Sequence, residues 1–323
     1  MECKNKQNKS LGRTKTVGQQ ILEILPIILD FFLLIIQVNY HIMEAIYRIF
    51  KPLDPSPVNN ELVLVTGAGH GIGRELALQY ASEGATLVLW DINEEGNQST
   101  AQAILKNGGA KPYTYTCDVS DRQSVLNVAR KVKEDIGDIS ILINNAGIMP
   151  AHPLEEHTEE EIKKIMSINV LAHFWTIEAF LPAMKKNNHG HIVALSSVAG
   201  IAGLPNLVPY CASKFAVRGL MESLMDELNW NPYNNVKLTS VCPYMVDTGL
   251  CKKPFVRFEN ALNLLEPKYV AAQIMHAQRT GILECTIPRF LLTVNYVTRL
   301  LPTKAASKVK AFFESGVHSD KGT

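Results

Sequence analysis

The hydrophobic pattern divides the chain into a nearly continuous apolar part before residue 50 and an alternating part after residue 60. In the second part, short apolar runs separate stretches in which apolar residues recur every three or four positions, which is typical of strands alternating with amphipathic helices. The predicted strands are Leu62–Thr66, Thr86–Asp91, Lys111–Cys117, Ile139–Asn144, His191–Ser196, Val236–Cys242 and Ile282–Ile287. Because alternating strands and helices form parallel sheets covered on both faces, we expect an α/β fold with a doubly wound parallel sheet in one domain, residues 61–288.

The apolar N-terminal part predicts a membrane-associated helical segment. Residues 1–16 form a basic leader, and residues 17–50 contain an apolar stretch about long enough for one span. Pro26 and Asp30 interrupt this stretch, and a carboxylate at the centre of a span costs about 2.5–3.5 kcal/mol. We therefore expect residues 17–50 to be a hydrophobic membrane anchor, inserted as a monotopic helix or a hairpin that leaves the following domain on the cytosolic side. A helix buried against that domain is the alternative.

Two further segments flank the alternating part. Residues 51–60 form a linker that prolines stiffen. Residues 289–323 form an amphipathic tail, in which apolar residues from Phe290 to Leu301 alternate with arginines. This pattern predicts a second membrane contact, and a dimer helix or a core helix explains it equally well, so a homodimer stays open.

Charge and cysteine usage narrow the classes of protein. The 32 Lys and Arg residues nearly balance the 31 Asp and Glu residues, so the net charge of +1 gives no electrostatic reason to expect nucleic acid. The six cysteines form no CxxC pair and no zinc-type spacing with histidine. We therefore expect reduced thiols in a cytosol-facing domain, no disulfide framework and no metal site.

A glycine-rich turn joins the first predicted strand to a helix, with the sequence Gly67-Ala68-Gly69-His70-Gly71-Ile72-Gly73. Such a turn lets the backbone approach a pyrophosphate, which the free N–H groups of the helix N-terminus attract in a Rossmann fold. Asp91 ends the second strand, where a carboxylate binds the adenosine ribose hydroxyls and repels a 2′-phosphate. The site is therefore predicted to take NAD(H) in preference to NADP(H). A helix N-cap is the alternative role for Asp91.

Tyr210 and Lys214 have the spacing of an acid–base pair. Positions four residues apart share one helix face, so the ammonium of Lys214 is expected near the phenol of Tyr210. That charge, together with a positive nicotinamide ring, is expected to lower the pKa of Tyr210 from about 10 to roughly 7–8. The predicted strand His191–Ser196 ends directly before Ser197, where a hydroxyl can hydrogen-bond a substrate oxygen, and a turn-capping serine is the alternative.

The motifs resemble those of the classical short-chain dehydrogenase/reductase family from about Glu61 to Pro288. The matching sequences are Thr66 to Gly73, Asp118-Val119, Asn144-Asn145-Ala146-Gly147, Ser197, Tyr210-Cys211-Ala212-Ser213-Lys214 and Pro243 to Thr248. The stretch Leu87–Asn93, the Asn188–His191 turn and the apolar N-terminus look like the membrane-associated branch with epidermal retinol dehydrogenases and lipid-droplet 17-beta-hydroxysteroid dehydrogenases.

The resemblance implies a role for each matching residue. Tyr210 is the implied general acid/base, Lys214 the residue that lowers its pKa and binds the nicotinamide ribose, and Ser197 the residue that holds the substrate oxygen. Asn169 matches an asparagine that supports a water-linked proton relay, and Asn144 one that stabilises the sheet. The implied cofactor-binding residues are Gly67, His70, Gly71, Ile72, Gly73, Asp91, Asp118, Val119, Asn145, Ala146, Gly147, Tyr210, Lys214, Pro243, Val246 and Thr248.

The resemblance also implies a function. We expect an NAD(H)-dependent enzyme that interconverts a lipophilic alcohol (retinol-like, steroid or fatty) and its carbonyl compound at the endoplasmic reticulum membrane or a lipid droplet. A non-catalytic NAD(H)-binding membrane protein or sensor is the alternative, and the intact Ser197, Tyr210 and Lys214 argue against it. The segment Gly249–Glu266 mixes apolar and charged residues and predicts a mobile substrate lid, with a surface helix pair as the alternative.

Overall fold

The structure, a computed structural model, describes residues 17–258, 263–313 and 315–321. The chain separates into two compact units, one up to Asp54 and one from Pro55 onward. The predicted basic leader, residues 1–16, lies outside the described residues.

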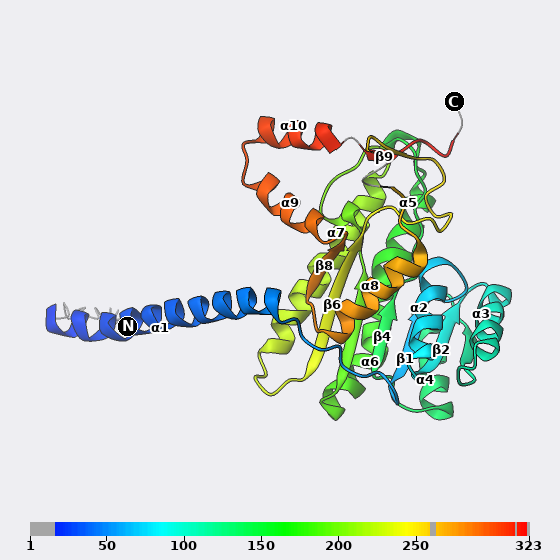
Figure 1. The fold of residues 1–323 in the computed structure, drawn as a ribbon, viewed down its shortest axis with the longest axis horizontal. Helices are drawn as coiled ribbons and strands as arrows, with labels where there is room; N and C mark the ends of the chain where they lie inside the picture. Colours follow the sequence, from blue (N-terminus) through cyan, green and yellow to red (C-terminus); the bar gives the residue numbers. More distant parts are fainter. Residues whose placement is uncertain (1–16, 259–262, 314, 322–323) are drawn as a thin grey trace, which may run out of the picture. The chain divides into compact units, whose positions relative to one another are not determined.

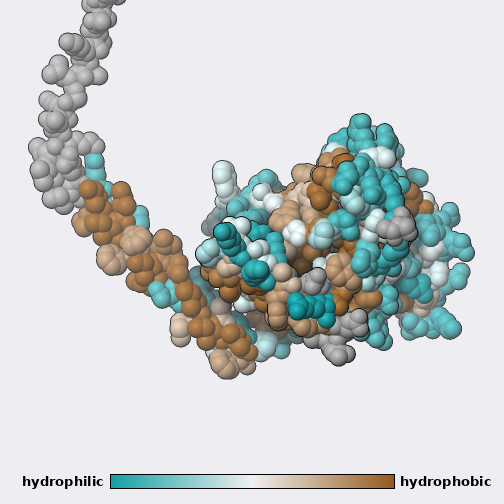
Figure 2. Space-filling model, turned by 90° about the horizontal axis from the view of Figure 1, so that it is seen from above, coloured by the Kyte–Doolittle hydropathy of each residue, from teal (hydrophilic) through white to brown (hydrophobic). Residues whose placement is uncertain are grey.

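The first unit contains one long helix, α1 (Val17–Phe50), which continues through Pro26. Its described apolar side chains, from Ile24 to Phe50, are exposed, and Figure 2 shows them as an apolar surface with few polar interruptions. A proline removes one backbone hydrogen bond, whereas the leucines and isoleucines around it favour the helix. The hairpin form of the predicted anchor is therefore wrong for these residues, because α1 contains no reversal of the chain.

Two helical stretches among the described residues are long and apolar enough to cross a membrane. The first, Glu23–Phe50, belongs to α1. The second, Glu159–Asn187, is partly buried and packs its side chains Ile177, Phe180 and Met184 into the core of the second unit. Both stretches meet the criteria of length and hydropathy, so burial distinguishes them, and the exposed stretch of α1 is the one compatible with a membrane segment.

The second unit contains the predicted parallel sheet (Figure 1). Its strands are β1 (Leu62–Thr66), β2 (Thr86–Asp91), β3 (Tyr113–Thr116), β4 (Ile141–Asn144), β5 (Gly190–Leu195), β6 (Val236–Pro243) and β8 (Glu284–Ile287). They pair in the order β3-β2-β1-β4-β5-β6-β8, and all the predicted strands are confirmed. β4 lies beside β1 on the side opposite β2, so the direction in which strands are added to the sheet reverses at the pair β1 and β4. A doubly wound sheet binds ligands at the carboxyl ends of such a strand pair.

Helices cover both faces of this sheet. One face packs against α2 (Gly71–Ser82), α3 (Glu94–Lys106) and α8 (Pro267–Arg279), and the other against α4 (Arg122–Asp135), α6 (Ala172–Asn187) and α7 (Val208–Asn229). Successive strand residues point to opposite faces, so Val63 joins the first layer and Leu64 the second. Burial on both faces explains why the strands read as continuous apolar runs.

Shorter elements complete the second unit around the carboxyl edge of the sheet. They are η1 (Leu154–Glu156), α5 (Glu159–Met166), the π-turn η2 (Ser167–Leu171), η3 (Val198–Gly200), β7 (Pro254–Val256), α9 (Phe290–Arg299), α10 (Thr303–Phe313) and β9 (Ser315–Val317). The predicted tail, residues 289–323, thus contains two helices and a strand within the same compact unit as the sheet.

The strand pair β7–β9, which the sequence pattern does not indicate, brings the C-terminal segment back over the sheet edge. β7 and β9 pair antiparallel, and Val317 is buried among Leu207 and Tyr210. The N–H of Asp320 donates to the carbonyl of Ala151 at 2.6 Å. β7 lies within the predicted lid Gly249–Glu266, of which residues 259–262 lie outside the described residues, so the lid stays a prediction.

Candidate active site

The glycine-rich turn between β1 and α2 has the backbone geometry that its sequence predicts. Gly67 and Gly71 have φ angles of +67° and +55°, in the left-handed region that favours glycine. A Cβ atom at Gly73 would lie 2.1 Å from the carbonyl oxygen of Gly67, so a larger residue would push α2 away from the turn. The N-terminus of α2 therefore opens at the crevice, where its free N–H groups attract anions.

Asp91 braces this turn from the end of β2. One carboxylate oxygen accepts a hydrogen bond from the N–H of Gly69 at 2.8 Å, and the other accepts from the N–H of Asn93 at 2.8 Å. The N-cap of α3 is Asn93, so the interpretation of Asp91 as a helix N-cap is wrong. Asp91 instead presents its carboxylate to the cavity beside the glycine-rich turn.

Asn145 fixes the same turn from the end of β4. Its side-chain amide donates to the carbonyls of Thr66 and Gly67 at 2.9 and 3.2 Å. The Thr66 hydroxyl in turn accepts from the N–H groups of Asn145 and Ala146 at 3.0 and 3.1 Å. The neighbouring Asn144 is buried and accepts from the hydroxyl of Thr176, which fits its expected role within the sheet.

Ser197, Tyr210 and Lys214 line the same cavity. Ser197 follows β5 and begins η3, where its hydroxyl accepts from the N–H of Ala199 at 3.1 Å. On α7 the Nζ of Lys214 lies 5.7 Å from the centre of the Tyr210 ring and donates to the carbonyl of Leu195 at 2.8 Å. The structure thus brings the strand-end hydroxyl and the i, i+4 pair together, as the spacing predicts.

Burial controls the protonation of this pair. It raises the pKa of Tyr210 to about 12, although the hydrogen bond with the Ser197 hydroxyl acts in the opposite direction. It lowers the pKa of Lys214 to about 8, because the buried ammonium loses its hydration. Burial therefore outweighs the other influences on the pKa of Tyr210 in the protein alone. The predicted lowering of this pKa by Lys214 together with a positive nicotinamide ring stays a prediction.

Asn169 lies outside the cavity wall, in the π-turn η2. Its side-chain oxygen accepts from the N–H of Ile148 at 2.9 Å, and its amide donates to the Ile148 carbonyl and to the hydroxyl of Ser213 at 2.9 and 3.1 Å. Both polar ends of the side chain are thus engaged in joining the segment after β4 to α7. Gly73 is the other predicted site residue that does not line the cavity, and the remaining predicted residues all line it.

The cavity has a volume of about 700 Å³, within the range of about 300–1,000 Å³ that is usual for small-molecule sites. Around Tyr210 its wall is apolar, with Met245 from the motif Pro243 to Thr248 and with residues that the sequence motifs do not include: Met149, Leu204, Leu207, Cys251 and Val317. Met149 lies two residues after the motif that ends at Gly147, so its position along the chain is a usable signal. Val317 has no such signal in the sequence, because its strand is three residues long and far from every motif.

A second cluster lies at the start of α5, where Glu161 lies 3.1 Å from His152 and 3.7 Å from His157. Among the described residues, it is the one group of three or more potential metal ligands whose ligand atoms all lie within 4.8 Å of one another. Its two imidazole rings are tilted by 31° with centres 3.7 Å apart, and the ammonium of Lys321 lies 3.9 Å from the carboxylate of Glu161. The positive charge of this ammonium would repel a cation at the cluster. The absence of a metal site stays a prediction.

Comparisons with known proteins agree with this arrangement. The family model described as short chain dehydrogenase matches residues 61–255. Estradiol 17-beta-dehydrogenase 11 from Homo sapiens is 42% identical over 283 residues, which cover 88% of this chain and 93% of that protein. Epidermal retinol dehydrogenase 2 from Homo sapiens is 41% identical over 265 residues, which cover 82% of this chain and 86% of that protein.

Solved structures share the fold. A short chain dehydrogenase/reductase from Burkholderia phymatum in complex with NAD has a TM-score of 0.68 and 26% identity, covering 80% of this chain and 97% of that chain. An alcohol dehydrogenase from Thermococcus sibiricus complexed with 5-hydroxy-NADP has a TM-score of 0.63 and 27% identity, covering 71% and 96%. The sequence motifs, the sheet order and these matches lead to one conclusion: this protein belongs to the short-chain dehydrogenase family of oxidoreductases.

Proposed function

We propose that this enzyme interconverts a lipophilic alcohol and its carbonyl compound with NAD(H), at a site formed by Ser197, Tyr210 and Lys214. One observation carries the proposal: a single cavity is lined by the glycine-rich turn, by these three polar residues and by an apolar cluster around Tyr210. A dinucleotide suits the turn, and an apolar substrate suits the cluster. The relatives named for estradiol and retinol, both lipophilic alcohols, support this substrate class.

The proposed chemistry divides between the cofactor and the side chains. When bound, the nicotinamide supplies the hydride acceptor or donor. The Ser197 hydroxyl holds the substrate oxygen, while Tyr210 takes the hydroxyl proton during oxidation and returns it during reduction. Lys214 holds the nicotinamide ribose and places positive charge near the phenol. Asn169 supports a water-linked proton relay by fixing the π-turn beside Lys214.

Burial gives the two directions of the reaction different pH dependences. With a pKa near 12, Tyr210 is protonated at neutral pH and is ready to donate a proton in carbonyl reduction. Oxidation needs the phenolate, so its rate should rise with pH until Tyr210 is ionised. A positive nicotinamide ring and a protonated Lys214 favour the phenolate, which moves this rise to lower pH.

The preference for NAD(H) rests on Asp91. A ribose 2′-phosphate placed near this carboxylate would meet like-charge repulsion, whereas ribose hydroxyls can donate hydrogen bonds to it. The carboxylate already accepts from Gly69 and Asn93, so its position is fixed before a cofactor binds.

Asp91→Ala should weaken NAD binding and narrow the advantage of NAD over NADP by about tenfold, equivalent to about 1.4 kcal/mol. Because alanine also removes the brace on the turn, Asp91→Asn serves as a second variant that keeps one acceptor oxygen and removes the charge. The measurement is kcat/KM for each cofactor, with Glu95→Gln on α3 as the charge-matched control. A wild-type preference for NADP would refute this cofactor assignment.

The proposed place of action is the cytosolic side of the endoplasmic reticulum membrane or the surface of a lipid droplet. α1 offers an exposed apolar surface. α9 exposes Phe290 and Val297, its C-cap Leu300 is exposed as well, and the exposed Arg289 and Arg299 lie at its two ends. Basic residues beside apolar ones suit an anionic membrane surface. A membrane-dissolved alcohol would then reach the cavity without crossing water.

A direct test of the activity uses detergent-solubilised full-length protein with estradiol, retinol and fatty alcohols, each with NAD and with NADP. NADH formation that saturates with at least one lipid alcohol is the expected result. Cofactor binding without hydride transfer to any member of the panel, in either direction, would point to a non-catalytic NAD(H)-binding protein.

A further inference from the structure

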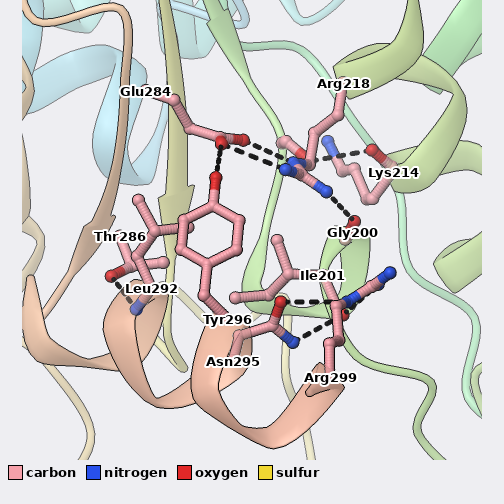
Figure 3. A network of polar contacts seen from close by, with 11 residues as sticks. Gly200, Ile201, Lys214, Arg218, Glu284, Thr286, Leu292, Asn295, Tyr296 and Arg299 are labelled. Carbon is pink, nitrogen blue, oxygen red and sulfur yellow. Dashed lines mark hydrogen bonds and ion pairs between the residues drawn. The ribbon is translucent and has the colours of Figure 1, made fainter. Parts of the chain in front are cut away.

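The turn that follows Ser197 ends in two carbonyl groups that side chains from two helices bind (Figure 3). Within η3 the N–H of Gly200 donates to the carbonyl of Ser197 at 2.8 Å, and the N–H of Ile201 donates to that of Val198 at 3.0 Å. The position of Ser197 therefore depends on where Gly200 and Ile201 are held.

Helix α7 holds the Gly200 end of the turn. Arg218, one turn after Lys214, donates to the Gly200 carbonyl at 3.2 Å and pairs with Glu284 of β8 at 3.0 Å. A Cβ atom at Gly200 would lie 2.4 Å from the Ser196 hydroxyl oxygen, which itself donates to the carbonyl of Lys214 at 2.8 Å. The turn thus packs directly on the helix that carries Tyr210 and Lys214.

Helix α9 holds the Ile201 end. The side-chain amide of Asn295 and the guanidinium of Arg299 both donate to the Ile201 carbonyl, at 2.9 and 3.0 Å. Arg299 also donates to the side-chain oxygen of Asn295 at 3.2 Å, so the two side chains orient one another. Its guanidinium lies 6.0 Å from the ring centre of Phe215, the neighbour of Lys214.

Strand β8 fixes α9 in place. The hydroxyl of Tyr296 donates to Glu284 at 3.1 Å, and the N–H of Leu292 donates to the hydroxyl of Thr286 at 3.0 Å. Because Glu284 also binds Arg218, the links from α7 and from α9 meet at one carboxylate (Figure 3). The turn after Ser197 is therefore clamped between two helices that share an anchor on the sheet.

We propose that Asn295 and Arg299 are positioning residues that fix the Ser197 hydroxyl for the substrate, a role that rests on the proposed function of Ser197. Neither residue lines the cavity, so both act through the Ile201 carbonyl. Without them, one side of the turn is free and the hydroxyl is held less tightly. A misplacement of about 1 Å at a reacting group can cost about 10²-fold in rate.

The test combines Asn295→Ala and Arg299→Met in the full-length, detergent-solubilised enzyme, with retinol and estradiol as the alcohols. Single-turnover hydride transfer should slow about tenfold, while the Kd for NADH stays within about twofold of wild type. Arg299→Lys, used in place of Arg299→Met, keeps a cationic donor at this position and should restore most of the rate of hydride transfer. Thr293→Ala, at an exposed position of the same helix, is the matched control.

A double-mutant comparison separates positioning from a general structural effect. In a Ser197→Ala background the two α9 substitutions should cause no further loss of rate, because their effect passes through the missing hydroxyl. Equal losses in both backgrounds, or an unchanged rate in the wild-type background, would overturn the proposal while leaving the role of Ser197 intact. A Ser197→Ala enzyme with wild-type turnover would instead overturn the proposed function and this inference with it. Asn295→Ala alone, with its thermal midpoint measured, serves if the combined variant does not fold.

Discussion

Replacing Tyr210 with phenylalanine should reduce turnover by about 10²–10⁴-fold, while the Kd for NADH changes by no more than about threefold. The hydroxyl is needed for proton transfer, whereas the ring, buried among Leu207 and Val317, still fills its place in the apolar cluster. Single-turnover measurement of NADH formation gives the rate, and titration of NADH fluorescence gives the Kd.

Tyr115→Phe is the matched control, because it also removes one tyrosine hydroxyl, here hydrogen-bonded to Asp135, and neither residue lines the cavity. Turnover of this control should stay near that of wild type. Tyr210→Phe with wild-type turnover would remove Tyr210 from the mechanism. A loss of both turnover and NADH binding would mean that the phenol supports the cavity rather than the proton transfer.

Deleting residues 17–50 should convert an almost entirely membrane-bound protein into one recovered mostly in the supernatant. Each apolar residue of the run Phe31–Ile36 favours insertion by about 0.3–0.6 kcal/mol, and α1 contains many more. Fractionation of cells that express each form is the measurement. Any residual binding through α9 should be lost in high salt, because Arg289 and Arg299 at its two ends contribute electrostatically.

Deletion of residues 1–16 alone is the control, and this form should remain in the membrane fraction. Protease treatment of intact microsomes tests the orientation, since a cytosol-facing catalytic domain is digested without detergent. Soluble behaviour of the full-length protein would contradict the anchor. Protection of the catalytic domain until detergent is added would contradict the proposed orientation.

The sheet was predictable because each of its strands has a signal in the local sequence. Leu62–Thr66 is a continuous apolar run that meets a glycine-rich turn, and both its length and its end follow from that pattern. β7 and β9 were not predictable, because each has three residues and their pairing joins segments about sixty residues apart. No local pattern in the sequence indicates this pairing, although the strand pair supplies a wall of the cavity.

The site shows the same division between local and tertiary information. The spacing of Tyr210 and Lys214 fixes their common helix face, and Ser197 follows from the end of β5. Their protonation does not follow from spacing, because desolvation depends on everything packed around them. The hydrogen bonds from Asn295 and Arg299 to Ile201 were not predictable either, since the polar face of an amphipathic helix is ordinarily expected to face solvent.

The short ribbon of β7 and β9 gives the cavity a wall with its own, lower local stability. A two-stranded ribbon of this length is marginal by itself in water, and the burial of Val317 helps to support it. Strands β5 and β6 are buried on both faces, so their amide hydrogens should exchange with solvent only when the whole domain unfolds, whereas those of β9 should exchange through small local openings. Such an opening would admit a bulky apolar molecule to the side of Tyr210 while β1 and its glycine-rich turn remain folded.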